Sequence, residues 1–500
     1  MSTALDKLTK HFATISDIQA ANALLSWDEN VYMPPGAASA RGQQKATLAL
    51  IAKERTTDKQ VGKWLDELEA ENPAEGSVAA ATLRELRRRF EHGTKIPSEF
   101  VEKLVKHQSH AYGAWTQARQ DNDFKSFAPV LEKTFDLARQ QAEYLGYDEH
   151  PYDALHDIYE IGSTAAQIKR VFEPLREETV KLVTAIRDSQ QVSDAPVRQN
   201  FDEAGQEAFA VDIIKNFGYD FQHGRLDRTI HPFAQSSSKY DVRITTRYDE
   251  NMLNPALFGT FHEAGHGIYE QGIADAYYRT PLAGAISLGI HESQSRLWEN
   301  LVGRSRAFWE GAYERLQATF PEQLGGVTLD AFYAAVNKVE PSLIRVEADE
   351  VTYNLHVMAR FELELALLEN SLKVSELPEA WNALYKDYLG VTVPNDANGC
   401  LQDVHWSVGL VGYFPTYTLG NLMSVQLFEA AQRDHPEIED DMRGGNFDKL
   451  SNWLRENVHS HGSRYLPGDL LKNATGEALS ADAYLNYLKT KFSVIYGLES

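Results

Sequence analysis

Apolar residues recur at three- and four-residue intervals along most of the chain, which is the spacing of one face of an α-helix. This periodicity predicts helices over the N-terminal residues 1–27 and over 79–92, 99–120, 165–187, 204–216, 292–315, 350–372 and 418–433. The best strand pattern covers residues 239–249, where β-branched residues alternate with polar ones. The chain is therefore predicted to be mostly α, with a small sheet near its middle.

A polar stretch at residues 188–203 interrupts the helical periodicity. It is the one candidate boundary in the sequence, and it predicts possible helical lobes over 1–190 and 204–500. No internal repeat or low-complexity run accompanies it. Since a large helical protein can reach this length as one unit, we predict a single domain over 1–500.

Composition narrows the classes of partner. Lys and Arg number 49 against 72 Asp and Glu, which gives a net charge of −23. A chain of this sign is not expected to bind nucleic acid or an anionic membrane surface. No apolar run approaches the roughly 18 residues of a membrane span, and the N-terminus lacks the features of a signal peptide. The single cysteine, Cys400, permits no internal disulfide and fits a cytoplasmic protein.

The segment FHEAGHGIYEQ at residues 261–271 carries candidate chemistry. On a helix, His262 and His266 lie on one face about 6 Å apart in rise, so both imidazoles can bind one ion. Glu263 lies beside that face and is placed to act as a general base on a water. Zn²⁺ suits such a site, and Co²⁺ or Mn²⁺ can substitute for it.

A third ligand is needed, and the local sequence does not supply it. Tyr269 and Gly272 stand where a metzincin has glycine and histidine, which excludes that class. Glu270 continues the four-residue series, but it lies about 12 Å of rise from His262 and cannot share the ion with both histidines. The ligand is therefore expected from another helix.

The next predicted helix, residues 287–303, offers two carboxylates. Glu292 and Glu299 are seven residues apart and share a face, so either can ligate, and the spacing favours Glu292 only slightly. The alternative for Glu299 is an ordinary carboxylate on the helix surface. His291 either supports a ligand from behind or contacts substrate.

Several short motifs together resemble the M32 metallocarboxypeptidases of the carboxypeptidase Taq type. They are WDENVYMPPGA at 27–37, HPF at 231–233, DVRIT at 241–245, HEAGH at 262–266, HESQS at 291–295, IRVEAD at 344–349, GCLQDVHW at 399–406 and GYFPTY at 412–417. The resemblance implies that His262, His266 and Glu292 bind zinc and that Glu263 is the base. It also implies a large helical peptidase fold with a deep active-site groove, a small sheet beside the zinc site, broad specificity and a homodimer.

A carboxypeptidase must bind a free C-terminal carboxylate, for which arginine is the natural partner. Arg345 and Arg243 are the candidates. Arg345 could instead form a structural pair with Glu347 or Asp349, and Arg243 could pair with Asp241. The sequence does not choose between the two arginines.

Amide hydrolysis also needs donors for the developing oxyanion. His405, Tyr413 and Tyr417 are available, and by analogy with related helical peptidases we assign His405 and Tyr417 to this role and Tyr413 to substrate binding. The sequence does not settle which tyrosine faces the oxyanion. The tyrosines could equally be core aromatics with satisfied hydroxyls. Gln402 and Asp403 are expected to orient a ligand histidine.

These residues predict a zinc metallocarboxypeptidase that releases C-terminal amino acids from peptides. One alternative is a helical zinc oligopeptidase or endopeptidase with the same site. Another, of a different class, is a non-catalytic scaffold that only binds metal.

Overall fold

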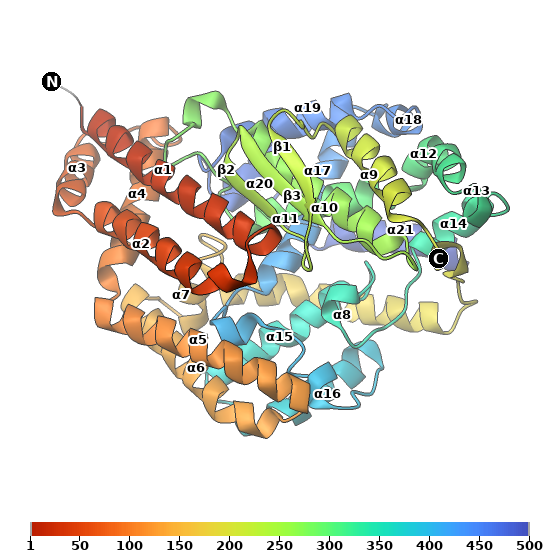
Figure 1. Ribbon diagram of the computed structural model, residues 1–500, viewed down its shortest axis with the longest axis horizontal. Coiled ribbons are helices and arrows are strands. Elements are labelled where there is room, and N and C mark those ends of the chain that lie inside the picture. The colour runs from red at the N-terminus through yellow and green to blue at the C-terminus, as the bar shows by residue number, and fades with distance from the viewer. Residues whose placement is uncertain (1–2, 499–500) are drawn as a thin grey trace. The chain divides into compact units, whose positions relative to one another are not determined.

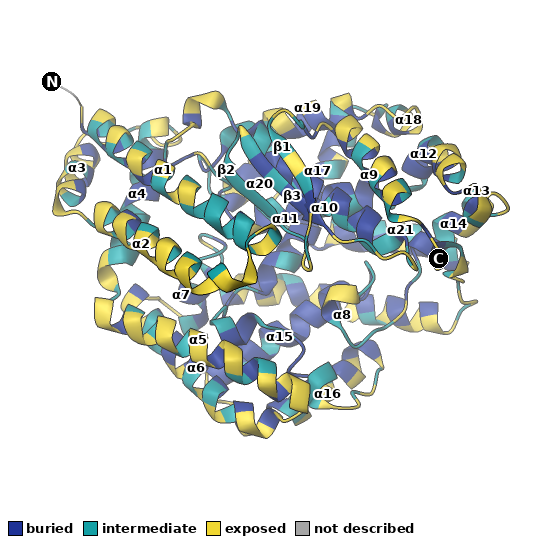
Figure 2. Ribbon diagram, viewed as in Figure 1, coloured by how far each residue is buried: buried dark blue, intermediate teal, exposed yellow. Residues whose placement is uncertain are grey.

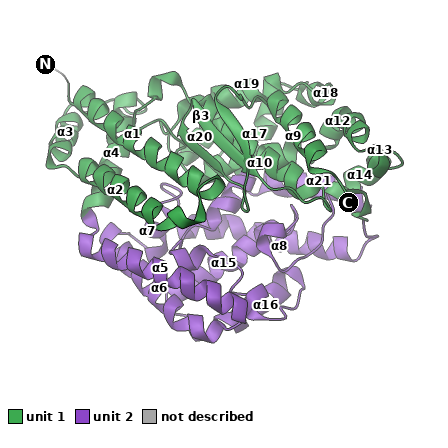
Figure 3. Cartoon of the chain, viewed as in Figure 1, with its two compact units in different colours: residues 1–94, 193–336, 423–479 green, residues 95–192, 337–422, 480–500 purple. Residues whose placement is uncertain are grey.

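Helices make up most of the structure, and the strands form one three-stranded sheet, as the computed structural model of residues 3–498 shows (Figure 1). The predicted fold class is therefore confirmed. The chain divides into two units, each made of three separate stretches (Figure 3). Unit 1 comprises residues 1–94, 193–336 and 423–479, and unit 2 comprises 95–192, 337–422 and 480–500.

This division differs from the predicted lobes. The chain passes from unit 2 to unit 1 between residues 192 and 193, and this boundary does fall inside the polar stretch 188–203. However, the first 94 residues belong with the middle of the chain in unit 1, where the helix over Ala4–Val31 packs against the strand over Ala234–Ser238. Periodicity in a sequence locates helices, but it carries no information about which distant helices pack together.

Unit 1 holds the sheet and the helix with both histidines. Its helices are α1 (Ala4–Val31), α2 (Ala38–Thr56), α3 (Lys59–Ala70), α4 (Val78–Lys95), α9 (Glu203–Phe217), α10 (Asn254–Gly272), α11 (Leu288–Arg296), α12 (Arg306–Thr319), α13 (Pro321–Leu324), α14 (Leu329–Val336), α18 (Ile438–Arg443), α19 (Asp448–Asn457) and α20 (Pro467–Thr475). Helix α17 (Pro415–Asp434) begins in unit 2 and continues into unit 1.

The sheet has the order β1 (Gly224–Arg228), β3 (Asp241–Thr246), β2 (Ala234–Ser238). Strand β1 is parallel to β3, and β2 is antiparallel to it. Val242 and Ile244 on β3 are fully buried, and α10 packs against this strand. The predicted strand 239–249 contains β3, but the sequence pattern misses β1 and β2 because their sequences, GRLDR and AQSSS, are mostly polar and contain no β-branched residue.

Among its described residues, unit 2 has helices joined by irregular stretches and no strand. Its helices are α5 (Ser98–Asp121), α6 (Phe124–Leu145), α7 (Pro151–His156), α8 (Ala165–Arg187), α15 (Tyr353–Leu368), α16 (Leu377–Leu389) and α21 (Asp482–Tyr496). Nearly every residue of α15 is buried, including the charged Arg360 and Glu364, whereas α2 of unit 1 is largely exposed (Figure 2). A helix buried on all sides forms the centre of its unit.

One predicted helix is broken in the structure. The segment 292–315 is α-helical only to Arg296, continues as a π-helical stretch over Leu297–Val302, and restarts as α12. The restart has a local cause, because the Ser305 side chain caps α12 by accepting from the Phe308 N–H at 3.1 Å. Isolated π-helical turns occur frequently at functional sites, and this one contains Glu299.

Candidate metal centre and active site

Helix α10 presents both histidines of the HEAGH segment. Its apolar residues, among them Leu257, Phe261 and Ile268, are buried and fix the rotation of the helix. His262 and His266 lie one turn apart with ring centroids 5.0 Å from each other. The helical spacing argument thus predicted their approach correctly.

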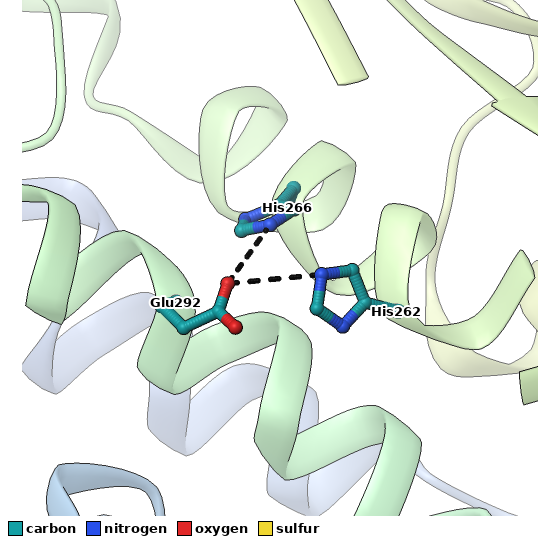
Figure 4. Close-up of side chains that lie close together, drawn as sticks. All are labelled: His262, His266 and Glu292. Carbon is teal, nitrogen blue, oxygen red and sulfur yellow. Dashed lines mark ion pairs between the residues drawn. The ribbon is translucent and has the colours of Figure 1, made fainter. Parts of the chain in front are cut away.

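Glu292 arrives from α11, whose first turn is capped by the Ser287 side chain accepting from the Ile290 N–H. Its Oε2 lies 3.7 Å from Nε2 of His262 and 3.5 Å from Nε2 of His266, and Figure 4 shows the three groups pointing toward one another. Tetrahedral Zn²⁺ with ligands at about 2.0–2.1 Å separates them by about 3.3 Å. The three side chains therefore fit a metal ion of this size.

Gly265 allows α11 to come this close. A Cβ built at Gly265 would lie 2.5 Å from the backbone oxygen of Gln294 and 2.7 Å from Cα of Ser295. These are backbone atoms of α11, so no side chain can rotate away to make room. The glycine inside the HEAGH segment is thus needed for the packing of α10 on α11, a role that sequence reasoning missed.

Substitution of Gly265 by Ala should separate the two helices and carry Glu292 away from the histidines. We expect a loss of about 1–3 kcal/mol in the free energy of unfolding, as for other overpacked cores, together with weaker metal binding. Chemical denaturation and a metal titration measure the two effects. The matched control is Gly259→Ala on the same helix, where an added Cβ meets nothing within 4 Å and helix propensity predicts slight stabilisation. Equal stability of the two variants would contradict the packing argument.

Burial and neighbouring charges set the ionisation of these groups. Burial lowers the pKa of His266 to about 3, which keeps its imidazole neutral as a metal ligand must be. Burial alone would raise the pKa of Glu292, but Arg296 and the two histidines hold it well below its usual range. Burial raises the pKa of Glu263 to about 7, so its carboxyl is poised near neutrality, as suits a general base.

Glu299 is not the surface carboxylate that the sequence suggested. Its Oε2 accepts a hydrogen bond from Nδ1 of His262 at 2.9 Å, and its side chain is only 14% exposed. Arg296 and Arg304 form ion pairs with it at 3.1 and 3.7 Å. Glu292 and Glu299 both reach His262, although Glu299 lies in the π-helical stretch that follows α11. The alternative of a solvated surface carboxylate at Glu299 is wrong.

His291 supports a ligand, which was one of its two predicted roles. Its Nδ1 lies 2.5 Å from Nδ1 of His266, and its Nε2 lies 3.1 Å from Oε1 of Glu270. Glu270, which helix geometry excludes as a metal ligand, therefore contacts His291, and His291 contacts the ligand His266. The side chains of His291 and Glu270 also line a cavity of about 440 Å³, to which residues of β2 and α1 contribute.

Unit 2 holds the remaining candidates, beginning with Arg345. Its Nε and Nη2 donate to Oδ1 of Asp403 at 3.1 and 2.9 Å, and its Nη1 donates to the Tyr353 hydroxyl at 3.0 Å. Arg360 donates to the other oxygen of Asp403 at 2.5 Å. Gln402 accepts from the Arg345 backbone N–H and from Arg360. The four groups form one network, in which Arg345, Arg360 and Gln402 are buried and Asp403 is nearly so.

One alternative and one expectation about this network need correction. Arg345 pairs with Asp403 rather than with Glu347 or Asp349, the structural partners that the sequence left open. Gln402 and Asp403 were expected to orient a metal-ligand histidine, but both form hydrogen bonds or ion pairs with arginines of unit 2. A carboxylate has the same appearance in a sequence whether its partner is imidazole or guanidinium.

His405, Tyr413 and Tyr417 lie together in unit 2. Nε2 of His405 is 3.3 Å from the Tyr417 hydroxyl, and the rings of His405 and Tyr413 are 5.5 Å apart. Burial lowers the pKa of His405 to about 3, so the ring is neutral. The guanidinium of Arg345 lies 5.1 Å from the centre of the Tyr417 ring. Three predicted residues are therefore brought into one cluster.

Arg243 lies in unit 1, on β3. It forms a two-pronged pair with Asp241, at 2.7 and 3.0 Å, and its guanidinium stacks 4.4 Å from the Trp27 ring centre. This pairing is the structural alternative that the sequence allowed for Arg243.

The described helices include none with the length and apolarity to cross a bilayer.

A family model described as carboxypeptidase Taq (M32) metallopeptidase matches residues 7–492. Thermostable carboxypeptidase 1 of Thermus thermophilus is 42% identical over 493 residues, with 96% of each chain covered. Carboxypeptidase 1 of Bacillus subtilis is 39% identical over 485 residues, again with 96% of each chain covered.

Solved structures agree with these matches. The M32 carboxypeptidase of Deinococcus radiodurans is 45% identical, with a TM-score of 0.96 over 99% of this chain and 100% of that one. Metallocarboxypeptidase 1 of Trypanosoma cruzi is 34% identical, with a TM-score of 0.93 over 98% of this chain and 99% of that one. The similarity therefore covers nearly the whole length in sequence and in fold.

Proposed function

The chain belongs to the carboxypeptidase Taq (M32) metallopeptidase family, and from this premise we propose that it releases C-terminal amino acids from peptides with broad specificity, as a zinc enzyme. The observation that carries the proposal is the cluster of His262, His266 and Glu292 with the buried Glu263 beside it. Three protein ligands leave a fourth position for water or substrate, as in catalytic zinc sites.

In this proposal His262, His266 and Glu292 hold the ion. When bound, Zn²⁺ supplies a Lewis acid that polarises the scissile carbonyl and makes a water more acidic. Glu263 takes the proton of the attacking water and later gives it to the leaving amine. The buried position and raised pKa of Glu263 support both its uptake of the proton from water and its donation of the proton to the amine. Co²⁺ or Mn²⁺ is expected to replace Zn²⁺ at these ligands.

His405 and Tyr417 are proposed to donate hydrogen bonds to the oxyanion, and Tyr413 to contact substrate. A neutral imidazole and a phenol are both donors that carry no competing charge. Their mutual contacts within unit 2 support a joint role. Preorganised donors of this kind typically contribute about 10²–10³-fold each to the rate.

Arg345 is the better supported anchor for the substrate carboxylate. Arg345 and Arg360 carry two positive charges against the single negative charge of Asp403, which leaves one in excess, whereas Asp241 fully neutralises Arg243. An excess positive charge favours a carboxylate ligand. The exposed fraction of the side chain favours Arg243 instead, at 21% against 5% for Arg345. The effects of Arg345→Lys and Arg243→Lys on KM should therefore be compared.

The proposal predicts that a peptide with a free C-terminal carboxylate is cleaved about 10²–10³-fold faster, in kcat/KM, than its C-terminal amide, because removing one partner of a desolvated charge pair costs about 2–5 kcal/mol. Mass spectrometry of the products gives both the rates and the bond cleaved. The N-acetylated free acid is the control and should be cleaved normally.

The same experiment separates the rival peptidase. Cleavage of the amide at an internal bond, as fast as the free acid, would identify an endopeptidase or oligopeptidase and overturn the carboxypeptidase proposal. The cytoplasmic location that the single cysteine suggests and the homodimer that the family resemblance implies remain predictions, which fractionation and light scattering can test.

A further inference from the structure

Three side chains, those of His266, His291 and Glu270, contact one another in series, beginning at a metal ligand and leading away from the metal position. Nδ1 of His266 lies 2.5 Å from Nδ1 of His291, and Nε2 of His291 lies 3.1 Å from the Glu270 carboxylate. The rings of His266 and His291 are 4.5 Å apart. His262, in contrast, is supported directly by a carboxylate, since its Nδ1 bonds to Glu299 at 2.9 Å. The two ligand histidines are thus held in different ways.

With both imidazoles neutral and Glu270 ionised, only one proton arrangement satisfies these contacts. A neutral imidazole carries its proton on one nitrogen and a lone pair on the other. A carboxylate accepts hydrogen bonds only, so Glu270 requires the proton of His291 on Nε2. Nδ1 of His291 is then bare and accepts from His266. His266 must carry its proton on Nδ1, which leaves the lone pair of Nε2 directed at Glu292 and the metal position.

From this geometry we infer that Glu270 and His291 are positioning residues that fix His266 in its metal-binding tautomer. The inference rests on the metal site of the proposed function. Both residues act through His266, and helix spacing keeps Glu270 itself from the ion. The arrangement extends the usual carboxylate support of a metal-bound histidine by one imidazole. It also gives a role to Glu270, which is only 17% exposed in its side chain.

The decisive comparison is between two substitutions of His291. Leu removes the acceptor for Nδ1 of His266, whereas Asn places its Oδ1 close to where Nδ1 of His291 stood. We expect His291→Leu to bind Zn²⁺ about 10–100-fold more weakly than wild type, the usual loss when such a partner is removed. His291→Asn should retain most of the wild-type affinity. Both variants should fold, since the His291 side chain borders the 440 Å³ cavity and is 20% exposed.

Glu270→Gln tests the far end of this series of contacts. The Gln amide can offer His291 either an oxygen or an NH₂ group, so it no longer selects one tautomer. We expect a loss of Zn²⁺ affinity that is measurable but smaller than that of His291→Leu. An affinity equal to wild type would remove Glu270 from the proposal.

Zn²⁺ affinity is measured by competition with a chromophoric chelator, with circular dichroism to verify folding. The matched control is His223→Leu, which breaks a histidine–carboxylate pair of 2.8 Å with Asp220 elsewhere in unit 1 and should leave affinity unchanged. Wild-type affinity in His291→Leu, or equal losses in His291→Leu and His291→Asn, would overturn the inference. Failure of the wild-type protein to bind Zn²⁺ would instead overturn the proposed metal site, so the two failures are distinguishable.

Discussion

Glu263→Gln is expected to lower kcat/KM for a free-acid peptide by about 10³–10⁴-fold, the upper range of what a general base contributes, while Zn²⁺ stays bound. Gln has the shape of Glu but cannot accept a proton from water or deliver it to the leaving amine. Glu263 is 6% exposed and lies on α10 between the two ligand histidines. The metal ligands are His262, His266 and Glu292, and none of them changes. Hydrolysis and chelator competition on one preparation measure both quantities.

Glu314→Gln on α12 is the control for this change, because the same substitution is made at an exposed position of the same unit. It should leave hydrolysis and metal binding unaltered. If Glu263→Gln hydrolyses peptide at the wild-type rate, Glu263 is not the base. If the wild-type protein binds Zn²⁺ and releases no amino acid from any free-acid peptide, the chain is the non-catalytic scaffold that the sequence left open.

The metal cluster was predictable because its parts are local or nearly so. The spacing of His262 and His266 on one helix fixes their approach, and the face shared by Glu292 and Glu299 limited the third ligand to two residues. The choice of Glu292 needed the family resemblance, since periodicity does not show how α11 is placed against α10. That placement depends on Gly265, and in a sequence a glycine in a helix does not indicate which backbone it contacts.

The network in unit 2 was less predictable for a related reason. Arg345, Arg360 and Asp403 come from three separate stretches, and their pairing depends on how those stretches pack. Short-range pairs such as Arg345 with Asp349 are the natural guess from a sequence, but a long flexible side chain reaches distant partners as easily. The same limit hid the contact between Glu299 and His262, which the π-helical turn places within 2.9 Å.

Loss of the Asp403 carboxylate should destabilise unit 2 strongly. Asp403 lies between Arg345 and Arg360, whose side chains are 5% and 0% exposed, and its own is 12% exposed. Burial would raise the pKa of Asp403, but Arg345 and Arg360 hold it far below its usual range. Asp403→Asn leaves two buried guanidinium groups without a counter-charge. Removing one partner of a buried pair costs about 3–5 kcal/mol, so we expect a loss of that size in the free energy of unfolding.

Chemical denaturation at pH 7 measures the loss, and hydrogen exchange of the α15 amides locates it in unit 2. Asp136→Asn is the matched control, because Asp136 pairs with Arg139 at 2.5 Å but is 51% exposed, and such pairs contribute about 1 kcal/mol or less.

The stabilisation contributed by Asp403 should fall as the pH is lowered. The folded pKa of Asp403 is depressed, so its stabilisation is complete above the unfolded value of about 3.9 and is lost as the pH falls below it. The stability difference between wild type and Asp403→Asn should therefore be constant near neutrality and narrow below about pH 4. A difference that instead widens below this pH, or that is no larger than that of Asp136→Asn at pH 7, would mean that Asp403 does not hold the two arginines by its charge.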